Sequence, residues 1–311
     1  MAPPPLRIVV TTGDPRGIGP EVARAALLRL EGVHPEVAVD LCGMVLDGTP
    51  GQRRWQPESF DGSESGAGRI ARSAIERAVA ILEAGEADAL VTGPIHKPAF
   101  RAAGVPEPGH TEFLQRLTRA PEVGMLMAAE ATRLGGPLRV LLATTHLALR
   151  DVPARLTTDL LSRQMTLLDE GLRRWWGFDR PRIALCAFNP HASDGGLFGD
   201  EEERIMQPAV DACRARGIEA SGPYPADTVF SRALSGRFDA VVAPYHDVGM
   251  AAFKTASFGG GVNVTLGLPF PRTSPDHGTA FDIVGTGTAD ASSMFEALDL
   301  AIKLARAAAP L

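Results

Sequence analysis

The chain alternates short apolar runs of strand length with longer segments of helical periodicity, and this alternation limits the folds open to it. Between these runs, apolar residues recur at helical spacing, most clearly over Ile70–Glu83. Such an alternation predicts an α/β fold with a mostly parallel sheet that helices cover on both faces. The strand-like runs are Leu6–Val10, Ala89–Val91, Leu138–Ala143, Ile183–Ala187 and Ala240–Ala243.

The first apolar run leads into the segment TTGDPRGIGPEV, which carries the signal of a helix start at Gly19–Glu21. Proline in the first turn loses only an N–H that would be unpaired, and an acidic residue suits the positive end of a helix. We therefore predict a strand, a glycine-rich turn and a helix over Val22–Leu30. The segment Asp47–Ser65 is rich in Gly, Pro, Ser and charge, which predicts a surface loop.

Charge and cysteine content exclude several classes of function. The 31 Lys and Arg against 37 Asp and Glu give a net charge of −6 without a long run of one sign, which argues against nucleic acid as the main partner. No apolar window approaches the ~18 residues of a membrane span, and the N-terminus has no signal-peptide pattern, so we expect a cytoplasmic protein with no membrane partner. The distant Cys42, Cys186 and Cys213 are predicted to be buried thiols rather than disulfides or zinc ligands.

Three of the seven histidines follow strand-like runs by three or four residues: His146 ends LLATTH, His191 ends LCAFNPH, and His246 ends VVAPYH. The carboxyl ends of the strands form the ligand crevice of an α/β sheet, so the three imidazoles can meet there. Three histidines with an open position form a catalytic metal site. No short spacing such as HExxH enforces this site, and a single histidine is more often structural, but the coincidence of three favours a metal.

Three cations lie among glycine, proline and apolar residues: Lys97 in VTGPIHK, Lys254 after GMAAF, and Arg272 in LPFPRTSPDHG. A lone lysine or arginine usually lies on a solvated face. In these surroundings a charge is better explained as a binding group for phosphate or carboxylate, and a guanidinium can bind such an anion with two hydrogen bonds. Asn263 follows glycines that let the backbone approach a ligand closely.

The glycine-rich segments do not match the usual dinucleotide fingerprint. Residues 276–290 contain Gly285-x-Gly287 but no complete GxGxxG, and no obvious strand and helix flank them. The segment Gly17-Ile18-Gly19 lacks both the third glycine and the acidic residue about 20 positions later. These glycines alone predict tight turns, not nicotinamide binding.

Nine segments together carry a resemblance to a known family. They are TTGDPRGIGPEV, VTGPIHK, GHTEFL, LLATTHLALRD, NPHASDGGLFGDEE, GPYPADTVF, YHDVGMAAFK, GVNVTLGLPFPRTS and DHGTAFDIVGTG. In order and over nearly the whole chain, they resemble the 4-hydroxythreonine-4-phosphate dehydrogenases of pyridoxal phosphate biosynthesis. The resemblance implies an NAD-dependent homodimer with a two-lobed α/β/α fold, similar to isocitrate and isopropylmalate dehydrogenases. We expect a first lobe of residues 1–120 and 281–311, and a second lobe of residues 121–280 with most of the metal and substrate residues.

The resemblance also implies roles for individual residues. One divalent metal per site, zinc, magnesium, manganese or cobalt, is bound by His146, His191 and His246, with ligands from both subunits. The phosphorylated substrate is contacted by His110, Thr111, Lys254, Asn263 and Arg272. Asp227 supports the site and is one of two candidate catalytic residues. The other is Lys254, for which we separately consider a role in assisting proton removal. The cofactor, NAD or alternatively NADP, faces His277, Gly278, Thr279, Ala280 and Asp282.

The implied reaction is oxidation of 4-phosphohydroxy-L-threonine at C3 by hydride transfer to NAD, with decarboxylation to 3-amino-2-oxopropyl phosphate. The chain departs from the family pattern in YHDVG for YHDQG, with Val248, in NPHASD for NPHAGE, and in residues 258–263, which lack the arginine of GFGRGVN. These changes bear on the substrate, so a sister dehydrogenase of 4-phosphorylated threonate or erythronate stays an alternative. A metal-dependent hydrolase and a catalytically silent phosphometabolite-binding protein are more remote alternatives.

Overall fold

The computed structural model describes residues 5–56, 59–257 and 260–308, and the chain divides into two units. The first unit is formed by Met1–Val123 and Val262–Leu311, and the second by Gly124–Gly261. Residues 262–280, which we expected in the second lobe, thus belong to the first unit. The reason is strand pairing, because β11 (Arg272–Pro275) pairs in parallel with β4 (Ala89–Thr92) of that unit.

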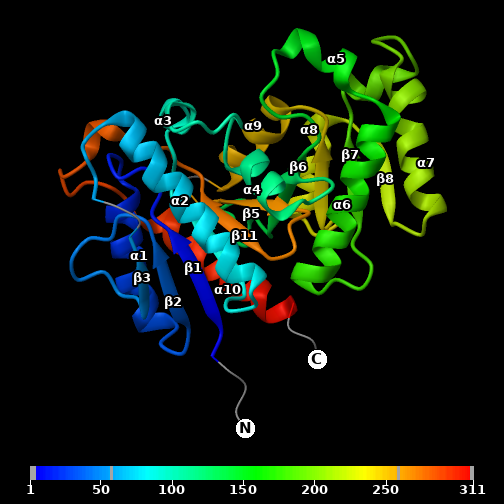
Figure 1. The fold of residues 1–311 in the computed structure, drawn as a ribbon. Coiled ribbons are helices and arrows are strands. Elements are labelled where there is room, and N and C mark those ends of the chain that lie inside the picture. Colours follow the sequence, from blue (N-terminus) through cyan, green and yellow to red (C-terminus); the bar gives the residue numbers. More distant parts are fainter. Residues whose placement is uncertain (1–4, 57–58, 258–259, 309–311) are drawn as a thin grey trace. The chain divides into compact units, whose positions relative to one another are not determined.

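The first unit contains a six-stranded part of the sheet with helices on both faces (Figure 1). Its strand order is β3 (Arg53–Trp55), β2 (Ala38–Cys42), β1 (Arg7–Thr11), β4, β11 and β10 (Val262–Leu266). Of the described pairs within this unit, only β10 and β11 are antiparallel. One face carries α2 (Glu64–Glu83), α3 (Lys97–Ala102) and α4 (His110–Thr118). The other face carries α1 (Gly19–Val33) and α10 (Ser292–Ala308).

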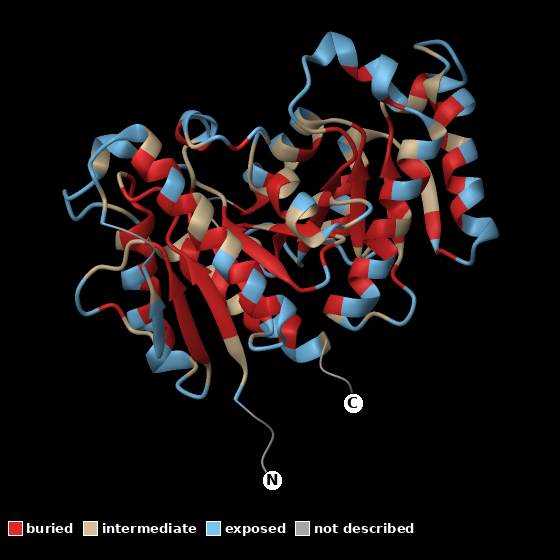
Figure 2. Cartoon of the chain, in the orientation of Figure 1, coloured by how far each residue is buried: buried red, intermediate tan, exposed pale blue. Residues whose placement is uncertain are grey.

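Local sequence explains the start and the buried face of α2. The Ser63 hydroxyl accepts a hydrogen bond of 2.9 Å from the Gly66 N–H, which caps the helix. Its apolar stripe, which includes Ile75 and Leu82, packs with Val9 into the core. The strands of this unit are buried, apart from the edge strand β3 (Figure 2).

The second unit has five strands in the order β5 (Gly124–Ala129), β6 (Leu138–Leu142), β9 (Ala240–Ala243), β7 (Ile183–Cys186) and β8 (Ala220–Tyr224). Among the described strands of this unit, only β5 and β6 pair antiparallel. The helices α8 (Ala226–Leu234) and α9 (His246–Ser257) pack on one face, and α6 (Thr158–Trp176) and α7 (Gln207–Ala215) on the other (Figure 1). Short helical turns connect these elements: η1 (Leu149–Asp151), α5 (Val152–Arg155), η2 (Pro190–Asp194) and η3 (Glu202–Met206), with η4 (Phe281–Ile283) in the first unit.

The structure confirms the predicted α/β class with a mostly parallel sheet, and each predicted strand lies within one or two residues of an observed one. The three cysteines are free and buried, as expected. The predicted loop Asp47–Ser65 is wrong in two places, since it contains β3 and α2 begins at Glu64. Within the described ranges, no helix is both long and apolar enough to cross a membrane.

Candidate active site

The three predicted metal ligands lie beyond the carboxyl ends of three neighbouring parallel strands of the second unit. His146 follows β6, His246 begins α9 directly after β9, and His191 lies in η2 after β7. Because β9 pairs in parallel with both β6 and β7, the three segments leave the sheet at the same edge. The predicted location of the histidines is therefore confirmed at the level of the elements.

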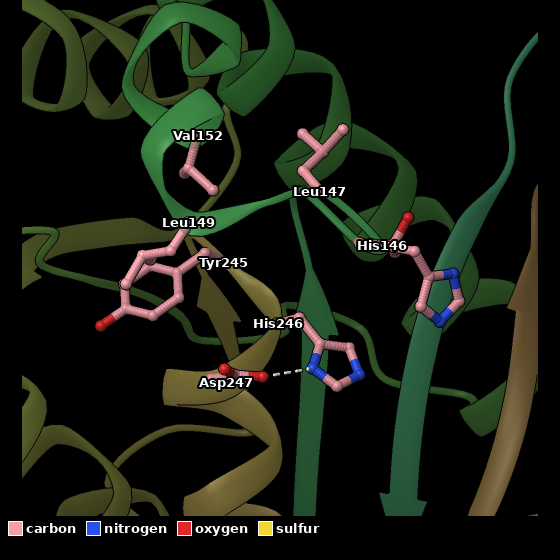
Figure 3. A pocket seen from close by; sticks show the side chains of 8 residues that line it. His146, Leu147, Leu149, Val152, Tyr245, His246 and Asp247 are labelled. Atoms are coloured by element: carbon pink, nitrogen blue, oxygen red, sulfur yellow. Dashed lines mark hydrogen bonds and ion pairs between the residues drawn. The ribbon is translucent and has the colours of Figure 1, made fainter.

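His146 and His246 line one pocket, together with Thr145, Leu147 and Tyr245 (Figure 3). Their ring centroids are 5.6 Å apart. The Nδ1 atom of His246 lies 2.7 Å from Asp247 Oδ1. When the carboxylate accepts a hydrogen bond from Nδ1–H, Nε2 keeps its lone pair, which is the arrangement that orients a metal-binding histidine.

His191 lines an adjoining pocket with Asn189, Asp227 and Val248, and Tyr245 borders both pockets. Among the residues that the structure describes, no three His, Cys, Asp or Glu side chains are grouped closely enough to hold a metal ion. One chain therefore brings two of the predicted ligands, His146 and His246, into the same pocket, whereas His191 lies in the adjoining pocket. The three-histidine metal site stays a prediction.

A separate polar cluster lies in the first unit around Arg272 of β11, which is only 2% exposed. Its guanidinium donates hydrogen bonds to Thr265 Oγ1, at 2.9 Å, and to Thr92 Oγ1. Its Nε has no partner in the described part of the chain, and no described carboxylate pairs with it. Burial lowers the pKa of Arg272 to about 9, because the charged form loses its hydration.

His110, the first residue of α4, belongs to the same cluster. Burial lowers the pKa of His110 well below 6.5, and the charge of Arg272 lowers it further, so the imidazole is neutral at neutral pH. The buried atoms His110 Nε2 and Asn263 Oδ1 lack hydrogen-bond partners within the described residues. Buried polar groups rarely stay unpaired in native proteins. The buried Arg272 cation and an imidazole N–H of His110 suit an anionic ligand, whereas the Asn263 oxygen can only accept a hydrogen bond.

The other predicted substrate and catalytic residues are placed as follows. Thr111 is half-buried in the first turn of α4. Lys254 is exposed in the last turn of α9, and Asp227 is exposed in the first turn of α8. Lys97 is exposed at the start of α3. Phe258 and Gly259 of the departing segment lie outside the described residues.

The glycine-rich segment 276–291 connects β11 to α10. Our expectation that no strand and helix flank it is therefore wrong. The sequence of β11, RTSP, has no apolar run, and its polar residues are buried by their tertiary environment instead. Within the segment, His277 and Thr279 are half-buried, Gly278 and Asp282 are exposed, and Ala280 adopts a left-handed φ of 42°.

This segment contacts the first glycine-rich turn. The Ile18 N–H donates to the Thr279 carbonyl at 2.9 Å, and the Gly285 N–H donates to Glu21 Oε1 at 2.7 Å. The Arg16 guanidinium lies 5.3 Å from the centre of the Phe281 ring. The two glycine-rich segments thus form one continuous surface.

Sequence reasoning missed Asp14, Arg16 and Asp247. The buried Asp14 carboxylate accepts hydrogen bonds from the backbone N–H of Arg16 at 2.9 Å and from its guanidinium at 2.8 Å and 3.1 Å. The sequence indicated this contact, because Asp14 lies two residues before Arg16 in a glycine-rich turn. At this spacing an aspartate side chain accepts a hydrogen bond from the backbone N–H of the same turn. Asp247 was signalled by its position next to His246.

Comparison with known proteins places the chain among its relatives. Residues 45–301 match the family model described as Pyridoxal phosphate biosynthetic protein PdxA. The chain is 41% identical over 321 residues to a 4-hydroxythreonine-4-phosphate dehydrogenase of Burkholderia vietnamiensis, and the match covers 97% of each chain.

Solved structures agree with this placement. The 1.25 Å crystal structure of 4-hydroxythreonine-4-phosphate dehydrogenase from Klebsiella pneumoniae has a TM-score of 0.84 at 38% identity, covering 96% of this chain and 99% of that one. Isocitrate dehydrogenase from Methylococcus capsulatus shares the fold, with a TM-score of 0.51 at 16% identity over 97% of this chain and 87% of that one. The chain belongs to the PdxA family of pyridoxal phosphate biosynthetic proteins.

Proposed function

We propose that the chain is an NAD-dependent dehydrogenase that oxidises 4-phosphohydroxy-L-threonine at C3, with decarboxylation to 3-amino-2-oxopropyl phosphate. The observation that carries this proposal is the buried Arg272, whose Nε lacks a partner within the described residues, beside the half-buried His110 with its unpaired Nε2, because a guanidinium and an imidazole N–H can both donate hydrogen bonds to a phosphate group. Relatives that match 96–97% of the chain are named as dehydrogenases of a phosphate ester.

In this proposal the phosphate group is anchored by the first unit. Arg272 supplies the charge, and the neutral His110 supplies a hydrogen-bonding ring nitrogen. His110 and Thr111 are the first residues of α4, and no side chain caps this helix, so its first backbone N–H groups favour the same anion. Fixing the phosphate orients C3 of the substrate, which lowers the entropic part of the barrier.

We further propose that His146, His191 and His246 hold one divalent metal ion. Of the metals considered, zinc suits imidazole ligands best, and Asp247 orients the His246 ring. When bound, the ion stabilises the negative charge that develops on the substrate hydroxyl oxygen, and NAD accepts the hydride. Asp227 lines the pocket of His191, and Lys254 is proposed to assist proton removal.

A second copy of the chain completes the site in this proposal. Exposed apolar side chains flank two of the histidines: Leu147 and Leu149 follow His146, and Leu197 and Phe198 follow His191. Apolar side chains gathered around a polar site mark an interaction surface. A homodimer that covers them can bring the missing imidazole across the interface.

The homodimer is tested with Leu197→Asp, because Leu197 is 72% exposed next to the predicted interface. We expect a dimer for the native chain in light scattering and a shift to monomer for the variant. Leu134→Asp is the matched control, since Leu134 is also exposed, at 62%, but lies in a turn away from the histidines. Equal dissociation of both variants, or a native monomer, would contradict the proposed interface.

The proposed reaction is tested by following NADH formation from 4-phosphohydroxy-L-threonine, with NAD or NADP. We expect activity that a chelator abolishes and a divalent ion restores. Product formed without any nicotinamide would instead identify a hydrolase. The cofactor is proposed to face His277, Gly278, Thr279, Ala280 and Asp282, on the surface that the two glycine-rich segments form.

A second candidate is a sister dehydrogenase of 4-phosphorylated threonate or erythronate. Val248 supports this candidate, because the residue departs from the family pattern and places an apolar side chain in the pocket that His191 and Asp227 line. The same assay with these phosphorylated acids separates the two candidates by their kcat/KM values.

A further inference from the structure

The turn that presents His191 is left-handed over four consecutive residues, none of which is glycine. The φ angles of His191, Ala192, Ser193 and Asp194 are 54°, 56°, 64° and 45°. This conformation brings Cβ too close to the following carbonyl oxygen and costs free energy at each residue. Such strain persists only where the surrounding structure fixes it.

Glu202 fixes the entry to this turn. Its carboxylate is buried, with 4% of the residue exposed, at the start of the π-helical turn η3. Oε1 accepts hydrogen bonds from the Phe188 N–H at 2.9 Å and the Asn189 N–H at 2.7 Å, and Oε2 accepts one from Asn189 Nδ2 at 2.9 Å. One carboxylate thus holds two consecutive backbone groups and a side chain just before His191.

A second carboxylate completes the grip on Asn189. Glu201 Oε2 accepts a hydrogen bond of 2.7 Å from Asn189 Nδ2. Gly199 leaves room for this contact, because a Cβ there would lie 2.6 Å from both Asn189 Nδ2 and Glu201 Oε2. The Asn189 amide is therefore clamped between two acidic side chains.

Glu202 has no cation to offset its burial among the described residues, and no hydrogen bond joins it to the His191 ring. A buried carboxylate held only by N–H donors is costly, and it rigidifies the segment that it bonds. That segment carries His191 into the pocket that Asp227 also lines.

We propose that Glu202 is a positioning residue, which holds the strained turn so that His191 is presented for metal binding. The proposal rests on the proposed function, because that function makes His191 a ligand. Glu202 itself does not touch the metal. The hydrogen bonds of the buried Glu202 carboxylate fix the backbone just before His191, and so fix where the His191 side chain projects.

The test compares Glu202→Gln with Glu203→Gln. The first variant keeps one acceptor oxygen but turns an NH₂ group toward the Asn189 amide, so two donors face each other. Glu203 is the next residue and is exposed, which makes it a matched control. After removal of bound metal, we expect Zn²⁺ to bind about tenfold more weakly to Glu202→Gln and unchanged to Glu203→Gln. Inorganic phosphate should bind both variants as it binds the native chain.

Amide hydrogen exchange of the metal-free protein supplies an independent readout. We expect faster exchange over residues 188–198 in Glu202→Gln and native rates elsewhere. Native exchange in this segment, or native Zn²⁺ affinity despite faster exchange, would overturn the proposal. Should Glu202→Gln not fold, Asn189→Ala removes only the side-chain part of the clamp, and the same two readouts apply.

His191→Ala separates this inference from the proposed function. If this variant binds Zn²⁺ like the native chain, His191 is not a ligand, and both the metal site and the positioning role fail. If His191→Ala loses the zinc site while Glu202→Gln retains it, the positioning role alone fails.

Discussion

At the scale of single residues, burial does more to define the candidate site than residue type. Arg272 was recognisable in the sequence as a cation among apolar neighbours, whereas His110 was indicated only by the family resemblance. What no sequence pattern shows is that their polar atoms are buried without partners. That property depends on which side chains tertiary packing brings around them, and it is the property that makes the cluster a candidate binding site.

The neutral state of His110 has a measurable consequence for stability. Its pKa is lowered well below 6.5, by burial and by Arg272, so the unfolded chain takes up a proton below about pH 6.5 that the native chain does not. The unfolding free energy therefore falls on acidification from that pH, by up to about 1.4 kcal/mol per pH unit. His110→Asn should remove this contribution. Urea unfolding between pH 7.5 and 5 measures it, and parallel pH curves for the two proteins would refute the assignment.

Arg272 should link stability to phosphate. Inorganic phosphate that binds only the native chain stabilises it by about 2.7 kcal/mol at a hundredfold excess over Kd. In Arg272→Met we expect no stabilisation by phosphate. The variant should nevertheless be no less stable than the native chain without phosphate, since it no longer buries a charge. Thermal unfolding with and without phosphate tests both points, and a variant that phosphate still stabilises would rule out Arg272 as the anion-binding group.

At the scale of elements, the predictable parts were those whose pattern is local. Apolar runs identified β1, β4, β6, β7 and β9, and helical spacing identified α2. The strands β3 and β11 were not predicted because charged or polar residues form them, RRW at a sheet edge and RTSP with the buried Arg272. The contact between the two glycine-rich segments escaped because it joins residues more than 250 positions apart.

That contact can be broken at Gly17. A Cβ there would lie 2.7 Å from the Thr279 carbonyl oxygen and 2.9 Å from its Cβ, so Gly17→Ala must push the two segments apart. We expect a loss of roughly 1–3 kcal/mol in stability and a weaker affinity for NAD.

Gly32→Ala is the control, because Gly32 lies exposed in α1 with nothing within 4 Å of its Cβ position. That change should stabilise by about 0.5–1 kcal/mol and leave NAD affinity unchanged. Urea unfolding and equilibrium titration with NAD give both quantities, and equal NAD affinities for the two variants would exclude the contact from cofactor binding.

At the scale of the whole molecule, the sequence predicted the edge of the sheet where the histidines lie but not their final geometry. Strand order places β6, β9 and β7 side by side, and this followed from no local pattern. The segments beyond these strands then differ, since His246 begins a helix whereas His191 lies in a left-handed turn. The structure of a single chain does not contain a histidine that a second copy would supply to the metal site.

A shared metal site makes a specific prediction for mixed dimers. Suppose that each site takes two histidines from one chain and the third histidine from the other chain. Two inactive variants then restore activity to each other when one variant lacks the third histidine and the other variant lacks one of the first two. Their mixed dimer then has one site with both substitutions and one with neither. Random exchange makes half of the molecules mixed dimers, so activity should recover to about a quarter of the native value.

The experiment uses the variants His146→Ala, His191→Ala and His246→Ala. Equimolar mixtures of two variants are unfolded and refolded together, and NADH formation is followed. Two of the three mixtures should recover, and the silent pair identifies the histidines that come from the same chain. Recovery in none of them would show that each site draws its three imidazoles from a single chain, and the rings would then have to move from the positions seen here.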